Sequence, residues 1–316
     1  MTLVAGMDVG GTSSRALVAD LSGKVVGTGL AGGGNPISRG VGPAMAAIRS
    51  ALEQALEGVD RSLVRGNVIG AAGFGSETGA HEALRQVWHE LGLPGGPVLI
   101  GDIDVAFASG TPEPDGSVLI SGTGAIAGEF VGGHAGRVAD GLGWLLGDHG
   151  SGFWIGRAAV RHACAPVATP GDPLAEAVAQ HLTGRAEVDR QAVVGAAYAV
   201  EPVRISELAR VVVECAEAGS AAAAAILETA ADELVTTLGQ VRDEGDASVV
   251  VLGGGMLGTA RLRGLVEERI AARWPGAPVT RCGSGVGGAA WLAARDLGEE
   301  LPPDLHATLT GASPAP

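Results

Sequence analysis

Two short turns that combine glycine with a threonine hydroxyl place the strongest constraint on how this chain can fold. Residues 7–14, Met-Asp-Val-Gly-Gly-Thr-Ser-Ser, and residues 120–125, Ile-Ser-Gly-Thr-Gly-Ala, each join two β-rich runs. Glycine tolerates positive φ angles and close approach, so backbone N–H groups and a hydroxyl in such a turn can converge on one oxyanion. Two turns of this kind predict a nucleotide held between two halves of the chain.

The composition favours regular α/β layers. Glycine accounts for 53 of the 316 residues, and aromatic side chains make up only 3% of the chain. The interior must therefore be filled by small aliphatic side chains on regular helices and strands. The length suffices for two domains of ordinary size, each with a core of its own.

The charge excludes two classes of partner. A net charge of −14 argues against nucleic acids and anionic membranes, because affinity for phosphate backbones comes from clustered lysine and arginine. No apolar run approaches the roughly 20 residues that cross a bilayer, and the first residues lack the pattern of a signal peptide. We therefore expect a soluble cytoplasmic protein without a nucleic-acid or membrane partner.

The order of predicted elements defines a first domain over residues 1–110. Strands are predicted at 3–7, 15–20, 24–29, 67–72 and 98–100, with helices at 41–56 and 77–91. Ser22-Gly23 predicts a tight hairpin turn between the second and third strands. The loop Thr-Pro-Glu-Pro-Asp-Gly at 111–116 consists of turn formers, so we place the domain boundary there.

The second domain, residues 111–285, opens in the same way, with a strand, a glycine-threonine turn and a strand. Residues 148–243 are predicted to be largely helical, and strands return at 248–252 and 278–281 around a helix at 259–273. A last helix, at about 286–298, can return to the first domain. The proline-rich residues 299–316 predict a flexible tail.

Common nucleotide-binding motifs are absent or uninformative. The pattern G-x-G-x-x-G occurs about as often as chance predicts in so glycine-rich a chain, and neither a P-loop nor the protein-kinase motif set is present. The informative feature is the conjunction of an acid before the first turn, Ser-Gly-Thr-Gly at 121–124, and a strand followed by Gly-Gly-Gly at 253–255. A nucleotide site of another type is therefore predicted.

Five segments in this order resemble the BadF/BadG/BcrA/BcrD ATPase family and, within it, the N-acetylglucosamine kinases. They are Asp8-Val9-Gly10-Gly11-Thr12, Gly101-Asp102, Ser121-Gly122-Thr123-Gly124, Gly147-Asp148-His149-Gly150-Ser151-Gly152 and Leu252-Gly253-Gly254-Gly255. The resemblance covers about residues 4–298. It implies an α/β protein with two ribonuclease-H-like domains of the actin-like ATPase and sugar-kinase superfamily, which close over ATP in a central cleft.

The resemblance also implies which residues hold the nucleotide. Asp8 is similar to the carboxylate that holds Mg²⁺, largely through water, as suits a hard cation that keeps part of its hydration shell. The phosphate-binding residues implied are Gly10, Gly11, Thr12, Ser13, Gly122, Thr123 and Gly124, and the adenosine-binding residues are Gly253, Gly254 and Gly255.

Asp102 resembles the catalytic base of the family. A carboxylate hydrogen-bonded to a sugar hydroxyl can orient it and accept its proton as the new P–O bond forms. The sequence by itself leaves an alternative open, because an acid after a strand is also a common helix N-cap. Asp104 is a nearby rival, although an acid in the first turn of a helix has a structural explanation as well.

The sugar-binding residues implied by the resemblance are Asn35, Asp102, Thr123, Gly143 and Asp148. Two of them have simpler explanations. Asn35, in the glycine loop before Pro36, could be a turn residue, and Asp148 could cap the helix that begins near Gly152.

Three positions depart from the amino-sugar kinases of the family. Ile126 replaces an Asn, Leu142 replaces a Trp, and His149 replaces a Glu. The loss of a polar and an aromatic contact is compatible with a broader hexose or hexosamine range. Phe153 and Trp154 are predicted to be core residues, and the role of Trp144 stays open.

The leading interpretation is an ATP-dependent kinase that phosphorylates the 6-hydroxyl of an amino sugar, N-acetylglucosamine above all, and analogy predicts a homodimer. The alternative is an ATPase that activates a partner redox enzyme. Such relatives bind an iron–sulfur cluster, whereas Cys164, Cys215 and Cys282 are dispersed and form no C-x-x-C pair. A sugar-responsive transcription regulator is disfavoured, because the first turn begins at Asp8 and leaves no room for a preceding DNA-binding domain.

Overall fold

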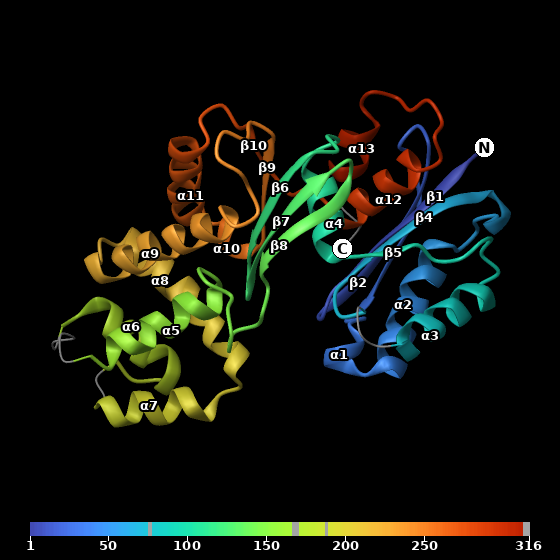
Figure 1. Ribbon diagram of the computed structural model, residues 1–316. Helices are drawn as coiled ribbons and strands as arrows, with labels where there is room; N and C mark the ends of the chain where they lie inside the picture. The colour runs from blue at the N-terminus through green and yellow to red at the C-terminus, as the bar shows by residue number, and fades with distance from the viewer. Residues whose placement is uncertain (75–77, 166–170, 187–188, 312–316) are drawn as a thin grey trace. The chain divides into compact units, whose positions relative to one another are not determined.

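The computed structural model describes residues 1–74, 78–165, 171–186 and 189–311. The chain divides into two compact units (Figure 1): unit 1 comprises residues 1–113 and 281–316, and unit 2 comprises residues 114–280. Each unit contains one five-stranded sheet. None of the helices in the described ranges combines the length and the apolar character that a membrane crossing requires.

Unit 1 is built on a sheet with the strand order β3-β2-β1-β4-β5. Its strands are β1 (Leu3–Val9), β2 (Ser13–Asp20), β3 (Val25–Gly32), β4 (Val64–Ala71) and β5 (Leu99–Ile100). β1, β2 and β3 form an antiparallel meander, whereas β4 runs parallel to both β1 and β5. The hairpin predicted at Ser22-Gly23 is present, and the Asp20 carboxylate closes it by accepting the N–H groups of Ser22 (2.9 Å) and Lys24 (3.1 Å).

Helices cover both faces of this sheet. They are α1 (Pro36–Arg39), α2 (Val41–Ala55), the 3-10 turn η1 (Arg61–Leu63), α3 (Thr78–Glu90), α4 (Asp102–Gly110), α12 (Gly285–Arg295) and α13 (Leu305–Gly311). Side chains of β1 alternate between the faces, as a strand requires: Met7 lies in the cluster with α2 and α3, and Val4 in the cluster with α4 and α12. α12 crosses so close to β1 that a Cβ atom on Gly6 would collide with the backbone of Ala290.

Residues 305–311 form a helix where the sequence predicted a flexible tail. Leu305 and Leu309 are fully buried against α12, and the imidazole of His306 lies 2.8 Å from the Ala108 carbonyl oxygen. The two leucines, spaced by four, give a single helical turn an apolar face. Because the Pro302-Pro303 pair comes just before these leucines, the sequence predicted a flexible tail and not this helix. Residues 312–316 lie outside the described ranges.

Unit 2 repeats the topology of unit 1, with the strand order β10-β9-β6-β7-β8. Its strands are β6 (Gly116–Ser121), β7 (Ala125–Val131), β8 (His134–Asp140), β9 (Val249–Gly253) and β10 (Val279–Arg281). β6, β7 and β8 form an antiparallel meander, and β9 runs parallel to β6. In both units, therefore, the first strand is central and leads directly into a glycine turn.

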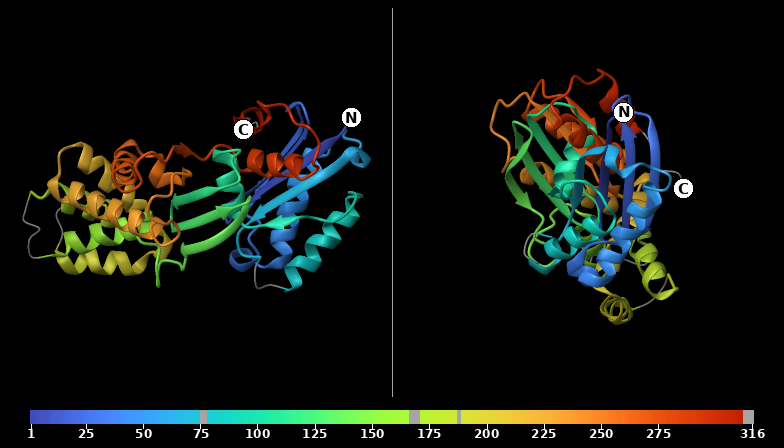
Figure 2. Two further views of the ribbon diagram at one scale, coloured as in Figure 1. Left: turned by 45° about the horizontal axis from the view of Figure 1, so that its top comes forward. Right: turned by 90° about the vertical axis from the view of Figure 1, so that its right-hand side faces the viewer.

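The middle of the chain is helical, as predicted. The helices of unit 2 are α5 (Gly152–Ala163), α6 (Pro173–Thr183), α7 (Arg190–Ala199), the 3-10 turn η2 (Pro202–Glu207), α8 (Leu208–Glu217), α9 (Ala221–Leu238), α10 (Gly255–Gly258) and α11 (Ala260–Arg273). α5 to α9 gather beside the three strands β6, β7 and β8 (Figure 2). The alanine-rich helix α9 is central to one continuous core, in which Leu227, Leu234 and Leu238 are fully buried.

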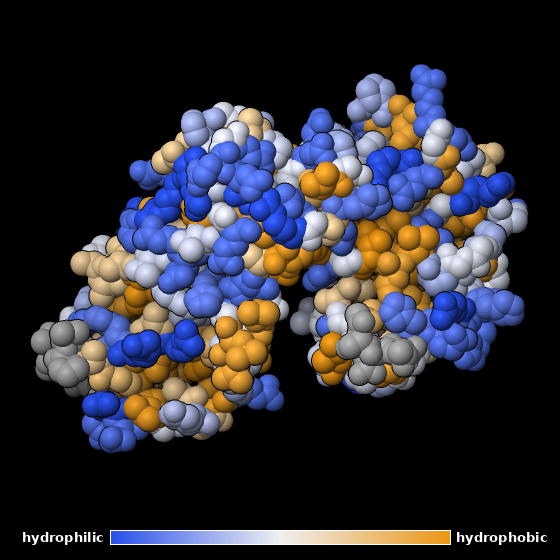
Figure 3. Space-filling view, in the orientation of Figure 1, coloured by the Kyte–Doolittle hydropathy of each residue, from blue (hydrophilic) through white to orange (hydrophobic). Residues whose placement is uncertain are grey.

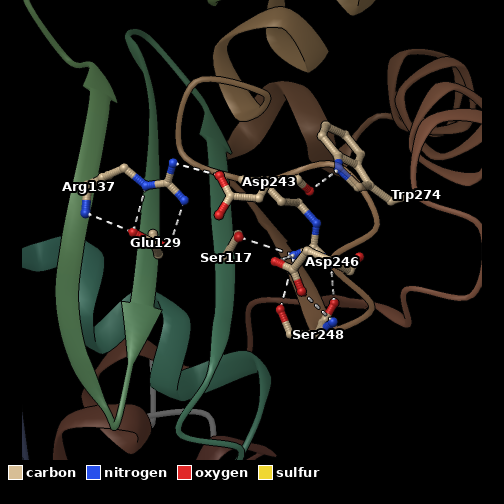
Figure 4. Close-up of polar contacts among 8 residues, drawn as sticks. Ser117, Glu129, Arg137, Asp243, Asp246, Ser248 and Trp274 are labelled. Atoms are coloured by element: carbon tan, nitrogen blue, oxygen red, sulfur yellow. Dashed lines mark hydrogen bonds and ion pairs between the residues drawn. The ribbon is translucent and has the colours of Figure 1, made fainter.

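A buried arginine fastens the connection between α9 and β9 to the sheet of unit 2. The Arg242 side chain is 0% exposed, and its terminal nitrogens donate to the Ser117 hydroxyl (3.2 Å), the Asp246 carbonyl (2.8 Å) and the Ser248 carbonyl (2.6 Å) (Figure 4). Its guanidinium also lies 5.6 Å from the ring centroid of Trp274. Burial lowers the pKa of Arg242, although the Asp246 carboxylate opposes the shift. Arg242 thus supplies hydrogen bonds to two part-buried carbonyls of this connection.

We expect Arg242→Ala to lower the free energy of unfolding by about 2–4 kcal/mol, because it removes a fully buried side chain together with its hydrogen bonds to the Ser117 hydroxyl and two part-buried carbonyls. Arg137→Ala is the matched control. Its side chain is 46% exposed between Glu129 and Asp243 (Figure 4), so its loss should cost less than about 1 kcal/mol. Urea unfolding of both variants measures the difference. Equal destabilisation by the two variants would contradict this account of Arg242.

Candidate functional site

The first turn (Gly10, Gly11 and Thr12) has its carbonyl groups fastened to the loop that follows β3. The Gly10 carbonyl accepts a hydrogen bond from the N–H of Gly34 at 3.0 Å. The Gly11 carbonyl accepts one from Nε of Arg39 at 3.3 Å. The orientation of the two peptide groups is therefore fixed by residues more than twenty positions along the chain.

Two of the three N–H groups of this turn are left uncommitted, because within the described ranges only that of Gly10 has an acceptor, the Ser13 carbonyl at 2.9 Å. Those of Gly11 and Thr12 have no acceptor among the described residues, and both residues are exposed. Since backbone N–H groups are strong donors, two adjacent free ones in a glycine turn form a cradle for an oxyanion. The structure thus gives the predicted phosphate-binding residues of unit 1 a suitable geometry, with Ser13 as the first residue of β2.

Asp8 projects from β1 next to this turn. Its cross-strand partner is Arg15, and both residues line a depression of about 570 Å³ together with the Gly283-Ser284-Gly285 turn. Burial raises the pKa of the Asp8 carboxyl and the charge of Asp102 raises it further, whereas the Arg15 guanidinium lowers it. Arg15 belongs to no sequence motif. The pairing register of the β1–β2 hairpin brings it to Asp8.

The Asp8 carboxylate fits the metal role that the resemblance implied. It makes no hydrogen bond or ion pair to another described residue, and open space lies in front of it. Groups of three or more His, Cys, Asp or Glu residues that could hold a metal are absent from the described part of the chain. Mg²⁺ needs no such cage, because it keeps several waters and takes one or two carboxylates.

Asp102 is the first residue of α4, and the N-cap position belongs to Gly101. The Asp102 carboxylate is exposed and accepts one hydrogen bond, from the N–H of Ile103 at 3.0 Å. The N-cap explanation for Asp102 is therefore wrong in this structure. The effect of its charge on the pKa of Asp8 places the two carboxylates within electrostatic reach of each other.

Asn35 has a structural role, although it is a helix cap and not the turn residue that the sequence offered as an alternative. It caps α1, with its Oδ1 atom accepting from the N–H groups of Ile37 (2.9 Å) and Ser38 (3.3 Å). A Cβ atom on Gly73 would lie 2.8 Å from the Asn35 amide nitrogen, so the side chain also packs against the loop after β4. The amide nitrogen, which donates to no described residue, is the part of Asn35 that remains available to a ligand.

The second turn (Gly122, Thr123 and Gly124) is built on the same plan as the first. The Gly122 carbonyl accepts from the N–H of Gly152 at 2.7 Å, and the Thr123 carbonyl accepts from the N–H of Phe153 at 3.2 Å. The first residues of α5 thus hold the carbonyls of the second turn. In unit 1, a loop N–H group and an arginine side chain hold the carbonyls of the first turn. Throughout the described residues no acceptor is found for the N–H groups of Thr123 and Gly124. Unit 2 therefore offers a second oxyanion cradle.

The Gly253-Gly254-Gly255 turn packs directly against the second turn. Gly254 has φ +90°, and a Cβ atom there would lie 2.9 Å from the N atom of Gly122 and closer still to the Ser121 carbonyl. Only glycine combines that φ with that proximity. The structure thus brings together, within unit 2, the residues predicted to bind phosphate and adenosine.

Asp148 lies beneath the second turn and does not cap α5, whose N-cap is Ser151. Its side chain is only 8% exposed, and Oδ1 accepts from the N–H of Ala125 at 3.2 Å. Burial raises the pKa of the Asp148 carboxyl and the charge of Asp140 adds to the rise, while the N–H groups of Ala125 and Gly143 lower it. Gly143, also predicted to line the sugar site, is therefore in contact with this carboxylate.

Asp140 holds Asp148 in place, although no motif in the sequence marks it as a site residue. Its Oδ1 accepts from the N–H of Asp148 at 2.6 Å, and its Oδ2 accepts from the N–H of His149 at 2.8 Å. Burial opposes the ionisation of Asp140, but these N–H groups hold its pKa below the usual range. Asp140 and Asp148 have φ values of 63° and 59°, a left-handed conformation that non-glycine residues keep where the surroundings enforce it. Such strain is frequent at functional sites.

We expect Asp148→Asn to abolish a loss of stability that occurs as the pH rises. A carboxyl whose pKa is higher in the folded state than in the unfolded state binds more protons in the folded state. The folded protein therefore loses stability as the pH rises through the folded-state pKa of this carboxyl. An amide does not titrate, and its oxygen can still accept from Ala125 or Gly143. Urea unfolding should show the variant more stable by up to about 1 kcal/mol near neutral pH and equal near pH 3. A variant less stable at neutral pH would contradict this expectation.

The segment between β8 and α5 is unusually apolar at its surface. Leu142, Trp144, Leu145 and Leu146 are between 41% and 73% exposed, and Figure 3 shows an apolar patch in this part of unit 2. Trp144 rests on the buried Phe153, with ring centroids 5.2 Å apart. Phe153 belongs to the core as predicted, whereas Trp144 keeps an open face beside the loop of Gly143 and Asp148.

Solved structures share this architecture. A candidate N-acetylglucosamine kinase from Chromobacterium violaceum superposes with a TM-score of 0.71 and 24% identity over 93% of this chain and 99% of its own. A ROK family glucokinase from Streptomyces griseus, in complex with glucose and AMPPNP, gives a TM-score of 0.55 and 20% identity over 93% and 98%. Together with the duplicated sheet topology, these similarities confirm the predicted fold class, an α/β protein with two ribonuclease-H-like domains of the actin-like ATPase type.

The chain belongs to the BadF/BadG/BcrA/BcrD ATPase family, whose model matches residues 5–293. A curated relative, the N-acetylmuramic acid/N-acetylglucosamine kinase of Clostridium acetobutylicum, is 29% identical over 167 residues. This match covers 52% of the chain and 54% of the relative, so the chain spans about half the length of that protein.

Proposed function

We propose that the protein is an ATP-dependent sugar kinase that transfers the γ-phosphate of ATP to the 6-hydroxyl of an amino sugar, with N-acetylglucosamine as the first candidate. The observation that carries the proposal is the pair of glycine turns, one in each unit. In each turn two carbonyls are fastened and two adjacent N–H groups have no acceptor among the described residues. Each turn is proposed to bind phosphate oxygens of ATP. Membership of an ATPase family and similarity to sugar kinases support this assignment.

The proposed chemistry is an in-line displacement. Asp102 accepts the proton of the 6-hydroxyl while that oxygen forms a bond to the γ-phosphorus, and the bond from phosphorus to the β–γ bridging oxygen breaks to release ADP. The free N–H groups of Gly11, Thr12, Thr123 and Gly124 stabilise the negative charge on the phosphate oxygens. Asp8 would hold Mg²⁺, which supplies further charge neutralisation at the phosphates when bound.

The sugar would be held by Asn35, Thr123, Gly143 and Asp148, in addition to Asp102. Asn35 offers its amide nitrogen, because its oxygen is committed to capping α1. Asp148 offers a buried carboxylate that the N–H groups of Ala125 and Gly143 orient. The Trp that relatives have at position 142 is an exposed Leu here, so we propose that other hexoses and hexosamines are accepted as well.

Coupled ADP release with Mg·ATP tests the function. The panel comprises N-acetylglucosamine, glucosamine, glucose, N-acetylmannosamine and N-acetylgalactosamine, with a blank that lacks sugar. Strong turnover that depends on one or more sugars supports the kinase. Hydrolysis in the blank that no sugar accelerates would overturn it.

The alternative, an ATPase that activates a redox partner, finds no support in the cysteines. All three are free, with Cys164 and Cys215 in unit 2 and Cys282 in unit 1. Burial raises the pKa of the Cys282 thiol to about 11. A cytoplasmic homodimer completes the proposal by analogy with relatives, and light scattering would test the dimer.

A further inference from the structure

Among the described residues, Arg39 is the one side chain that hydrogen-bonds to the first turn, and the proposed function gives it no role. It is the last residue of α1 and is exposed, and its Nε atom donates to the Gly11 carbonyl at 3.3 Å. That bond places the guanidinium against the carbonyl side of the first turn. Asn35, at the other end of the same four-residue helix, is the proposed sugar contact in this unit.

The two terminal nitrogens of Arg39 have no hydrogen-bond acceptor within the described part of the chain. Some arginines of this acidic protein contact carboxylates, for example Arg49 with Glu90 and Arg137 with Glu129, whereas others, such as Arg61, have no such contact among the described residues. No described carboxylate contacts Arg39 in this way. Its planar fork is therefore available for an external oxyanion, the group that a guanidinium binds best.

We propose that Arg39 binds an oxyanion of the substrates through its terminal nitrogens, at the edge of the first turn. This inference rests on the proposed function for the identity of the substrates. Two groups have the required chemistry: the phosphoryl group in transfer, and a carboxylate carried by an acidic amino sugar. A lysine or a neutral residue could not supply the same pair of parallel donors.

A purely structural role is the competing explanation, since a basic residue at the end of a helix can serve only to hold a nearby carbonyl. Two substitutions separate the roles. Arg39→Gln keeps an N–H donor for the Gly11 carbonyl but loses the positive charge, whereas Arg39→Lys keeps the charge. The matched control is Arg61→Gln, which changes an exposed arginine in η1 of the same unit.

Steady-state kinetics identify the oxyanion. If the oxyanion is the phosphoryl group, Arg39→Gln lowers kcat with neutral sugars by about 10²- to 10³-fold, and Arg39→Lys lowers it less. If it is a sugar carboxylate, Arg39→Gln leaves neutral sugars unaffected and raises KM for N-acetylmuramic acid by about 10- to 100-fold. Either result supports the proposal, provided that Arg61→Gln is unchanged.

Calorimetric binding of ADP with fluoroaluminate, a mimic of the phosphoryl group in transfer, needs no turnover and so separates this inference from the proposed function. Lack of sugar-dependent turnover in the unaltered protein would overturn the kinase assignment. Tighter binding of the mimic by the unaltered protein than by Arg39→Gln would still support an oxyanion at Arg39. Two results would overturn the inference. In the first, Arg39→Gln matches Arg61→Gln in every assay. In the second, Arg39→Lys is less active and less stable than Arg39→Gln.

Discussion

Replacement of Asp102 by Asn is expected to lower kcat for sugar phosphorylation by about 10²- to 10⁴-fold, while the affinity for ATP stays nearly unchanged. The amide has almost the same shape as the carboxylate but cannot accept the proton of the sugar hydroxyl. The side chain is exposed and makes a single hydrogen bond, to the N–H of Ile103. The amide oxygen can accept that bond too, so the fold should be unaffected.

Asp104→Asn is the matched control for Asp102, because it changes a second carboxylate in the first turn of the same helix. Rapid-mixing measurement of phosphoryl transfer, with nucleotide affinity from a separate titration, distinguishes a lost base from lost binding. If Asp102→Asn kept full turnover and Asp104→Asn lost it, the base would be Asp104.

Gly254→Ala should have the largest effect on structure. Gly254 has φ +90°, and a Cβ atom at this position would collide with the Ser121 carbonyl at the end of β6. Alanine is strained at this φ, and the collision adds to the strain, so we expect the free energy of unfolding to fall by about 2–4 kcal/mol. Because the displaced backbone is that of the second turn, ATP affinity should fall as well.

Gly258→Ala controls for the added methyl group. Gly258 ends the short helix α10, four residues along, and a Cβ atom there meets nothing within 4 Å. Alanine has the higher helix propensity, so this variant should be at least as stable as the unaltered protein. Thermal unfolding and nucleotide titration of both variants provide the test. If Gly254→Ala were as stable as the unaltered protein, the Gly253-Gly254-Gly255 turn would not be in firm contact with the second turn.

Much of the fold could be predicted because local sequence patterns indicate its strands, turns and helices. The strand, glycine turn and strand sequence occurs at both β1–β2 and β6–β7, and the alternation of apolar residues marks the strands around it. Long helices such as α9 follow from propensity alone. The helix at 305–311 was missed, because its two leucines become an apolar face only when α12 covers them.

The candidate site was predictable in its residue types and not in its contacts. The sequence suggested that Asp148 could cap α5, yet Ser151 does so, and Asp148 accepts from Ala125 instead. It suggested that Asp102 could be an N-cap, yet Gly101 occupies that position. Neighbouring residues compete for one cap, and backbone geometry decides between them.

The sequence by itself determined that this protein has two similar α/β halves and that each carries a glycine turn able to bind an oxyanion. Turn chemistry depends on adjacent residues, so it can be recognised without the fold. Only the tertiary structure decided what holds those turns: Arg39 for Gly11, 28 positions away, and the start of α5 for Gly122 and Thr123. Those bonds join segments that are distant in sequence, and chain folding alone brings such donors and acceptors within reach of each other.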